Sequence, residues 1–532
     1  MPTKYPLVIA LAFSFALSGC GGGGKPFSNE GTALNPVTGR ADEEAIAARE
    51  KQKIDPVVDE FQRLVQIHGG FFTADPALVD YVNAVGNTVA QTDPMTDAPF
   101  QFVITNNSMP QVFCKPGGKV AISRGLLAEL SSEAELAAVL SHEVALSVMP
   151  AALVTDNLAP VHDLASYDST MPIGNPTFQY ATGKTDELDQ VSFDETFVIE
   201  ADRTSVPALA AAGYDATAAI SFNERMLAEK QANTPSWIHG ILQNSPCSDS
   251  RTEAISEAVA QVASGGFVGS DKYSSLTASL RSQAPAYHKL TLANKALWEG
   301  KADKAIILAK EGRSQAPNEG RFFSIMGRAY LNQGRYNEAV VSFNQAIFSD
   351  PSYYDNYLQR GITFLEMGNY SDARKNLEKS LGLLPTAEAH YHLGEIALET
   401  GEFDLARRHF FKASATSAPI SSLAAEQLAM LDLRSNPSKF VSLRASLDGR
   451  GFLTIAAVNN SPIPINEVIV SLRVLNTPDI RNANKVIRFS EEIPAGKAKA
   501  SLTDIGPFDG KEHLKSCLEA AVVGANPMIS ME

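Results

Sequence analysis

Basic residues are scarce in this chain. Its 45 Lys and Arg residues stand against 60 Asp and Glu, which leaves a net charge of −15 over 532 residues. Nucleic-acid binding depends on basic patches that neutralise phosphates, so this balance argues against a nucleic-acid partner. It also argues against adhesion to anionic lipid. The apolar content of 44% and charged content of 20% are those of an ordinary folded protein, and the length allows about three domains.

Long apolar runs are confined to the N-terminus. The run PLVIALAFSFAL follows Lys4 and is too short to remain as a membrane span. The next residues, LSGC, resemble a bacterial lipobox in which Cys20 is lipidated. We therefore expect a lipoprotein signal peptide over residues 1–19 and a flexible tether over 20–40. Because Gly21 rather than Asp follows Cys20, the expected location is the periplasmic face of the outer membrane, although a plain signal peptide with a chance cysteine is the alternative.

Cysteine is also scarce, with four residues in the whole chain. Setting Cys20 aside leaves Cys114, Cys247 and Cys517, in a compartment that is oxidising. Three is an odd number, so at least one thiol stays free or pairs between chains.

A metal-binding motif is present only in part. The stretch LSHEVALSVMP begins like the zinc-peptidase motif H-E-x-x-H, with His142 and Glu143, but Leu146 stands at the second histidine. In such a motif the two histidines bind zinc one turn apart, and the Glu acts as general base. Alternating strands before this helix and a second helix over 194–213 indicate an α+β domain up to about residue 270.

The second half of the chain repeats with a period of 34 residues. Prolines recur at 317, 351, 385 and 419, and each interval carries small residues, among them Gly327, Gly361 and Gly394. A period of this kind is the tetratricopeptide (TPR) signature, which predicts an all-α TPR solenoid over residues 285–432. Its groove would bind extended or helical peptides and has no chemistry of its own.

From about residue 437 the apolar pattern changes to period two. The segments FVSLRASL, FLTIAAVN and EVIVSLRVL alternate, with DGRG as a turn between the first two. We predict an all-β sandwich over residues 437–532. The expected architecture is thus multidomain.

The region around the His-Glu pair resembles the zinc metallopeptidase family that includes the CAAX prenyl protease, HtpX and BepA. The matching features are Pro-Gly-Gly at 116–118, Gly-Leu-Leu at 125–127, Ser-x-x-Glu-Leu at 132–136 and the downstream EADRTSVPALAAAGYD. The resemblance implies a gluzincin-like metallopeptidase domain over residues 41–270. With a lipid anchor and TPR repeats, the chain resembles BepA-like outer-membrane lipoproteins in architecture.

Carried onto this chain, the zinc site of the family is incomplete. His142 corresponds to the first ligand and Glu143 to the general base. The second and third ligand positions hold Leu146 and Val198, which cannot bind metal. Asp202, which hydrogen-bonds the metal site in the family, is retained. The resemblance therefore implies that the zinc of the family is absent, that Glu143 is vestigial, and that Asp202 holds His142 in place.

Two alternatives remain open. In the first, an active metalloendopeptidase uses substitute ligands. Glu195 and Asp202 share one helical face, and His162 and His239 lie on flanking loops, so two of these could join His142. In the second, the chain is purely a TPR scaffold.

The resemblance also carries implications for partners and cysteines. It implies that unfolded or assembling outer-membrane proteins, or their assembly machinery, bind in the TPR groove, and that the lipid anchor holds the protein to the membrane. In related proteins the segments of Cys114 and Cys247 flank the cleft, which predicts a disulfide between them. The alternative is that Cys114 is a small buried apolar residue.

Overall fold

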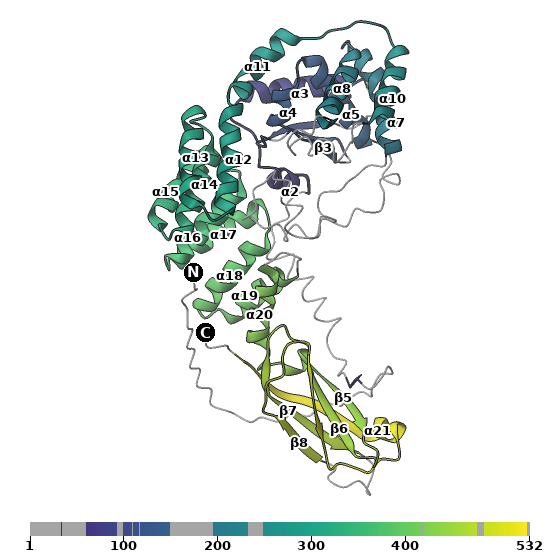
Figure 1. The fold of residues 1–532 in the computed structure, drawn as a ribbon, viewed down its shortest axis with the longest axis vertical. Coiled ribbons are helices and arrows are strands. Elements are labelled where there is room, and N and C mark those ends of the chain that lie inside the picture. Colours follow the sequence, from purple (N-terminus) through teal and green to yellow (C-terminus); the bar gives the residue numbers. More distant parts are fainter. Residues whose placement is uncertain are drawn as a thin grey trace. The chain divides into compact units, whose positions relative to one another are not determined.

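The fold is seen in a computed structural model (Figure 1). It describes residues 33–34, 60–92, 99–108, 110–115, 117–148, 195–231, 248–415, 420–475 and 484–528. Cys20, the signal peptide and most of the tether lie outside these residues. The chain divides into two compact units. The larger is Gln52–Thr400 with Thr416–Pro419, and the other is Met1–Lys51, Gly401–Ala415 and Ile420–Glu532.

An α+β domain, here residues 60–282, opens the larger unit, as the sequence predicts. In its three-stranded sheet β4 lies between β2, which is parallel to it, and β3, which is antiparallel. Helices α3 and α5 pack on this sheet and share its apolar core. The elements are α2 (Glu60–Ile67), α3 (Pro76–Ala90), β2 (Gln101–Thr105), β3 (Val112–Lys115), β4 (Lys119–Ser123), α4 (Arg124–Glu129), α5 (Glu133–Val148), α7 (Glu195–Ala211), α8 (Thr217–Gln231), α10 (Asp249–Ala260) and α11 (Ser270–Ser282).

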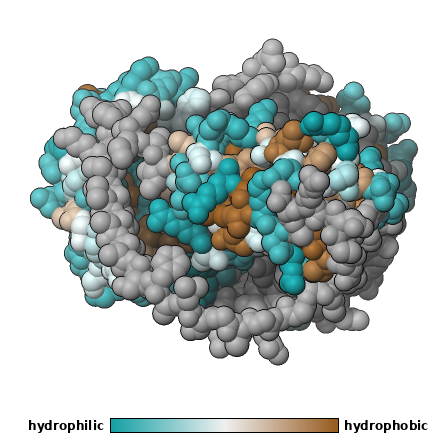
Figure 2. Space-filling view, turned by 90° about the horizontal axis from the view of Figure 1, so that it is seen from below, coloured by the Kyte–Doolittle hydropathy of each residue, from teal (hydrophilic) through white to brown (hydrophobic). Residues whose placement is uncertain are grey.

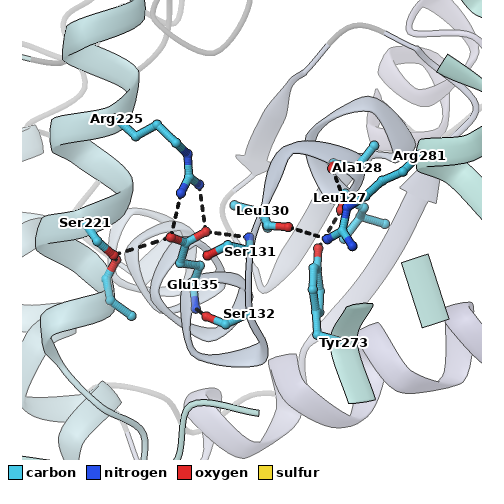
Figure 3. A network of polar contacts seen from close by, with 11 residues as sticks. Leu127, Ala128, Leu130, Ser131, Ser132, Glu135, Ser221, Arg225, Tyr273 and Arg281 are labelled. Atoms are coloured by element: carbon cyan, nitrogen blue, oxygen red, sulfur yellow. Dashed lines mark hydrogen bonds and ion pairs between the residues drawn. The ribbon is translucent and has the colours of Figure 1, made fainter. Parts of the chain in front are cut away.

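The start of α5, the helix of the His-Glu pair, is fixed by a buried carboxylate (Figure 3). Glu135 accepts two hydrogen bonds from Arg225 of α8, at 2.8 and 2.7 Å, and one from the backbone N–H of Ser131 at 2.7 Å. Burial opposes ionisation, but these bonds outweigh it and lower the pKa of Glu135. A buried charge that is paired in this way holds the helix in one position.

Helix α11 belongs to the same core, although it begins at the predicted domain end near residue 270. The hydroxyl of Tyr273 donates to the carbonyl of Leu127 at 2.6 Å (Figure 3). Arg281 donates to the carbonyls of Ala128 and Leu130 at 3.1 and 2.7 Å. The next helix, α12, starts after a single intervening residue, so the α+β domain continues almost directly into the repeats.

The repeats are helix pairs, as their period predicts. Gly327 and Gly361 lie where the two helices of a pair meet, because an added Cβ would stand 2.6 Å from Phe343 and 2.9 Å from Leu377. The helices of the larger unit are α12 (Ala284–Trp298), α13 (Ala302–Gln315), α14 (Gly320–Asn332), α15 (Tyr336–Ser349), α16 (Tyr354–Glu366), α17 (Tyr370–Leu383) and α18 (Ala387–Glu399). Helices α19 (Phe403–Ser414) and α20 (Ile420–Asp432) belong to the other unit.

Helix α2 connects the α+β domain to the repeats. The side-chain amide of Gln66 donates to the carbonyl of Ser352 at 2.8 Å, and its carbonyl accepts from the N–H of Tyr354 at 3.1 Å. Its neighbour Ile67 packs in one apolar cluster with Tyr353 and Tyr354 of the repeats. Both hydrogen-bonding groups of the amide are thus paired at an apolar interface.

A buried ionic network forms a second contact between the same modules. Arg124, the first residue of α4, lies 3.3 Å from the centre of the Tyr287 ring, and its Nη2 is 3.6 Å from Glu319 Oε2. Glu319 accepts hydrogen bonds from the hydroxyl of Tyr287 at 3.0 Å and from Arg321 at 3.0 and 3.1 Å. Two arginines therefore share one carboxylate out of contact with water.

Glu319 should make the stability of the larger unit depend on pH. Burial opposes its ionisation, but Arg321 and Arg124 outweigh burial and lower the pKa from 4.5 to about 2. Such a group stabilises the fold above its unfolded pKa, and the contribution is lost as the pH falls through the folded value. A difference of about 2.5 pH units corresponds to about 3 kcal/mol.

We expect Glu319→Gln to cost about 3 kcal/mol near pH 6, and this cost to shrink steadily as the pH falls below about 4.5. Urea-unfolding midpoints of natural and variant chains at a series of pH values measure it. Glu378→Gln, at an exposed carboxyl of α17, is the control. A cost that stays constant with pH would contradict the pairing.

The C-terminal β domain has two sheets that share one apolar core. One sheet has the order β1-β5-β6-β9, and the other has the order β10-β7-β8, with antiparallel pairing throughout. The predicted turn DGRG joins β5 and β6. The elements are β1 (Ala33–Leu34), η3 (Pro437–Lys439), β5 (Val441–Leu447), β6 (Leu453–Asn459), β7 (Ile465–Val474), β8 (Asn484–Phe489), β9 (Ala498–Leu502), α21 (Lys511–Cys517) and β10 (Leu518–Pro527). The sheets face each other as predicted, but they form an open sandwich rather than a closed one.

Candidate functional site

The retained polar residues meet between α5 and α7. His142 and Glu143 lie in the middle of α5, and Asp202 lies on α7, which packs along it. The Nδ1 atom of His142 is 2.8 Å from Asp202 Oδ1. This is the contact that the sequence leads us to expect, and it orients the imidazole as a carboxylate orients a metal-binding histidine.

Arg251 of α10 is a further member of the site that sequence reasoning missed. Its Nε donates to Asp202 Oδ2 at 2.7 Å and its Nη2 to Oδ1 at 2.8 Å. Burial opposes ionisation of Asp202, but His142 and Arg251 outweigh it and lower the pKa to about 2. The sequence signal was an arginine in the first turn of a helix, where the helix dipole disfavours positive charge unless a carboxylate is near.

Glu143, at the general-base position, lies beside the thiol of Cys114 of β3, and the two groups influence each other's ionisation. Burial raises the pKa of Glu143, while His142 and the thiol act in the opposite direction. Burial and the Glu143 carboxylate raise the pKa of Cys114 well above its usual value, so the thiol is protonated and unreactive at neutral pH.

Cys114 is a free thiol in this structure. The predicted disulfide with Cys247 is therefore not formed here, and the alternative, a small residue packed with apolar neighbours, describes Cys114 better. Cys247 itself lies outside the described residues. The physical reason for the error is that adjacency to a cleft does not set the direction of a side chain, and Cys114 points to Glu143.

The two remaining ligand positions are apolar and buried. Leu146 is 4% exposed and Val198 is fully buried. Leu146 packs with Ala145, Ala201 and Cys114. Hydrocarbon side chains donate no electron pair, so these positions do not fit a tetrahedral zinc site with three protein ligands.

Substitute ligands do not gather around His142 within the part of the chain that the structure describes. No group of three His, Cys, Asp or Glu side chains there is placed to hold a metal ion. His162 and His239 lie outside the described residues.

A small cavity lies beside the site. Its volume is about 50 Å³, and its lining includes His142, Glu143, Asp202 and Arg251 with apolar side chains such as Phe222. Such a space holds one or a few water molecules. It is too small for a large apolar side chain.

A His-Glu pair on one helix, facing an Ala-Asp pair on a second helix beside a three-stranded sheet, defines a metallopeptidase-like domain with an incomplete ligand set. Comparison with models of protein families then assigns this domain to a family. Residues 76–156 match the model of peptidase family M48, and residues 327–368 and 358–420 match tetratricopeptide repeat models. The chain thus contains a peptidase family M48 domain followed by TPR repeats, which confirms the family resemblance.

Among curated relatives, the β-barrel assembly-enhancing protease of Yersinia pestis is 29% identical over 186 residues, which are 33% of this chain and 38% of the relative. The mitochondrial metalloendopeptidase OMA1 of Arabidopsis thaliana is 30% identical over 140 residues, 26% of this chain and 28% of the relative. The chain spans less than two-fifths of the length of these relatives.

Solved structures add a likeness for the repeats. A thermophilic TPR protein of Thermus thermophilus is 22% identical, with a TM-score of 0.26 over 31% of this chain and 90% of that one. In the described residues, no helix is both long and apolar enough to cross a membrane.

Proposed function

We propose that this protein is a pseudoprotease, a lipid-anchored periplasmic lipoprotein that binds client or partner proteins during envelope protein assembly or quality control. The observation that carries the proposal is the packing at the ligand positions. Leu146 and Val198 are buried, and Leu146 packs with Ala145 and Ala201. The two positions are thus buried hydrocarbon beside the polar residues that the site retains.

The chemistry of the retained residues supports this proposal. A zinc peptidase needs a metal to lower the pKa of its water to near 7, and Glu143 then takes the proton. Losing one residue that hydrogen-bonds a metal ligand already costs about 10–100-fold in metal affinity. This chain lacks two of the ligands themselves. Asp202 is neutralised by Arg251, so the charge of the site is balanced without a metal.

Strand addition is the proposed way in which the old cleft binds a chain. In the described sheet, β3 pairs with β4 on one side only. An extended peptide can continue such a sheet through main-chain hydrogen bonds. Because the cavity beside β3 is small, binding would depend on the backbone more than on large side chains, which suits a module with many clients.

The repeats supply the second proposed contact. TPR stacks present extended binding surfaces, and large apolar side chains of this stack reach the solvent, namely Ile307, Val341 and Phe348. Across the face of the whole chain that is drawn in Figure 2, hydrophobic residues lie between hydrophilic ones. The name of the relatives, β-barrel assembly-enhancing protease, supports outer-membrane proteins or their assembly machinery as partners. The lipobox at Cys20 supports anchoring to the outer membrane.

The purified mature protein should contain far less than one zinc ion per chain, because two ligand positions are hydrocarbon. Metal analysis by mass spectrometry after dialysis against a weak chelator measures the content. Stoichiometric zinc that survives dialysis would overturn the proposal and favour an active metalloendopeptidase with substitute ligands.

A further inference from the structure

Two contacts of opposite character lie between the α+β domain and the repeats. The first is the contact of α2, in which Gln66 pairs with the backbone at Ser352 and Tyr354, and Ile67 joins an apolar cluster of the repeats. Every polar group of the amide has its partner, and Ile67 is only 9% exposed. The association of the α+β domain with the repeats at this contact, here called closure, is therefore favourable.

The second contact, that of Arg124, works against closure. Arg124 is 2% exposed, and its Nε and Nη2 atoms have no hydrogen-bond acceptor among the described residues. Its nearest carboxylate oxygen, Glu319 Oε2, is 3.6 Å from Nη2. Burial and the charge of Arg321 lower the pKa of Arg124 to about 10, although Glu319 acts in the opposite direction. The Tyr287 ring, 3.3 Å from the guanidinium, compensates part of the cost of burying this charge, and the remaining cost opposes the closed state.

Glu319 does not need Arg124 as a partner. Arg321 donates two hydrogen bonds to its carboxylate, and the hydroxyl of Tyr287 donates a third. Arg124 is thus a surplus positive charge that closure of the interface takes out of water. The network would remain paired if Arg124 were uncharged.

Helix α2 is built to connect the two modules. On one side Phe61 and Val65 pack with β-strand residues of the α+β domain, while Gln66 and Ile67 contact the repeats. Gly70, just after the helix, lies so close to the repeats that an added Cβ would stand 3.1 Å from the Tyr353 ring. The helix therefore remains with the α+β domain when its contact with the repeats is broken.

We propose that α2 is a latch, which holds the α+β domain on the repeats against the cost of burying Arg124, so that the two modules separate reversibly. Opening lets Arg124 return to water and exposes Ile67 and Tyr353. The open state therefore exposes apolar side chains that the closed state covers. This proposal stands whether or not the cleft binds zinc.

The test is hydrogen exchange of the Tyr354 amide in the full-length chain, because this N–H is bonded to Gln66 only while the latch is closed. Ile67→Ala keeps that acceptor but weakens the latch, and should speed exchange by at least about tenfold. Arg124→Met keeps the length and removes the charge, and should slow exchange by about tenfold. The two variants should thus change the exchange rate of the Tyr354 amide in opposite directions, which a static interface would not produce.

Two controls separate opening from general loosening. Gln62→Ala changes an exposed residue of the same helix and should leave exchange unchanged. The amide of Thr400, which donates to the carbonyl of Ile396 at the end of α18, should exchange alike in every variant. Unchanged exchange in Ile67→Ala would overturn the proposal. So would faster or unchanged exchange in Arg124→Met, or failure of that variant to fold, since the proposal makes its closed state more stable.

Discussion

The double variant Leu146→His, Val198→Glu should bind zinc, whereas we expect the natural chain to bind little. It restores three ligands on two packed helices, and His142 already has its Nδ1 paired with Asp202, the arrangement that orients metal-binding histidines. Both new side chains are buried, so without metal each should destabilise the protein by about 1–3 kcal/mol. Zinc at about 1,000 times its dissociation constant would then return about 4 kcal/mol.

The melting temperature of the double variant with and without zinc measures this effect, together with the zinc bound per chain. Leu146→Asn, Val198→Gln is the matched control, because it buries two polar groups at the same positions without supplying the ligand set. If zinc does not raise the melting temperature of the double variant above that of the control, the two helices have moved away from the geometry of the family.

The second large effect is expected in the repeats rather than in the cleft. In a strain that lacks the gene, Glu143→Gln should complement any envelope defect fully, because it keeps the shape and removes only a carboxylate that the proposed pseudoprotease does not use. Gly361→Leu should not complement. An added Cβ at Gly361 would already stand 2.9 Å from Leu377, and overpacking of this kind costs about 1–3 kcal/mol and disturbs the helix pair on which clients would lie.

Lys379→Leu is the control for bulk in the repeats, since it adds a large apolar residue at an exposed position of α17. Immunoblots of protein levels separate loss of fold from loss of binding. If Glu143→Gln behaved like the deletion, the His-Glu helix would still be catalytic, and the pseudoprotease proposal would be wrong.

The predictions that the structure confirmed rest on patterns among residues that are close in sequence. The alternation around β3 and β4, the helix of the His-Glu pair and the 34-residue period of the repeats each depend on neighbours within a few turns. The contact between His142 and Asp202 was also foreseen, because a family resemblance places those two helices side by side. The incomplete ligand set stays a prediction, which depends on the family resemblance together with the identities of Leu146 and Val198.

Contacts between distant residues were not foreseen. Arg251 pairs with Asp202 over 49 residues of sequence, and Gln66 with Tyr354 over 288. The predicted Cys114–Cys247 disulfide failed for the same reason, since the direction of the Cys114 side chain depends on how β3 packs against α5. The hydrophobic periodicity of a helix or strand does not indicate which distant residue its side chains will contact.

The sequence by itself thus determined the modules, their order and the hydrocarbon side chains at the two positions that the resemblance assigns to metal ligands. These follow from local periodicity and from which side chains can donate an electron pair. Only the tertiary structure decided what fills the old site, what balances the charge of Asp202, and how α2 and Arg124 act in opposition at the repeats. Those outcomes depend on which buried groups meet across the fold, because a charge or an amide out of water is stabilised only by the partner that packing places beside it.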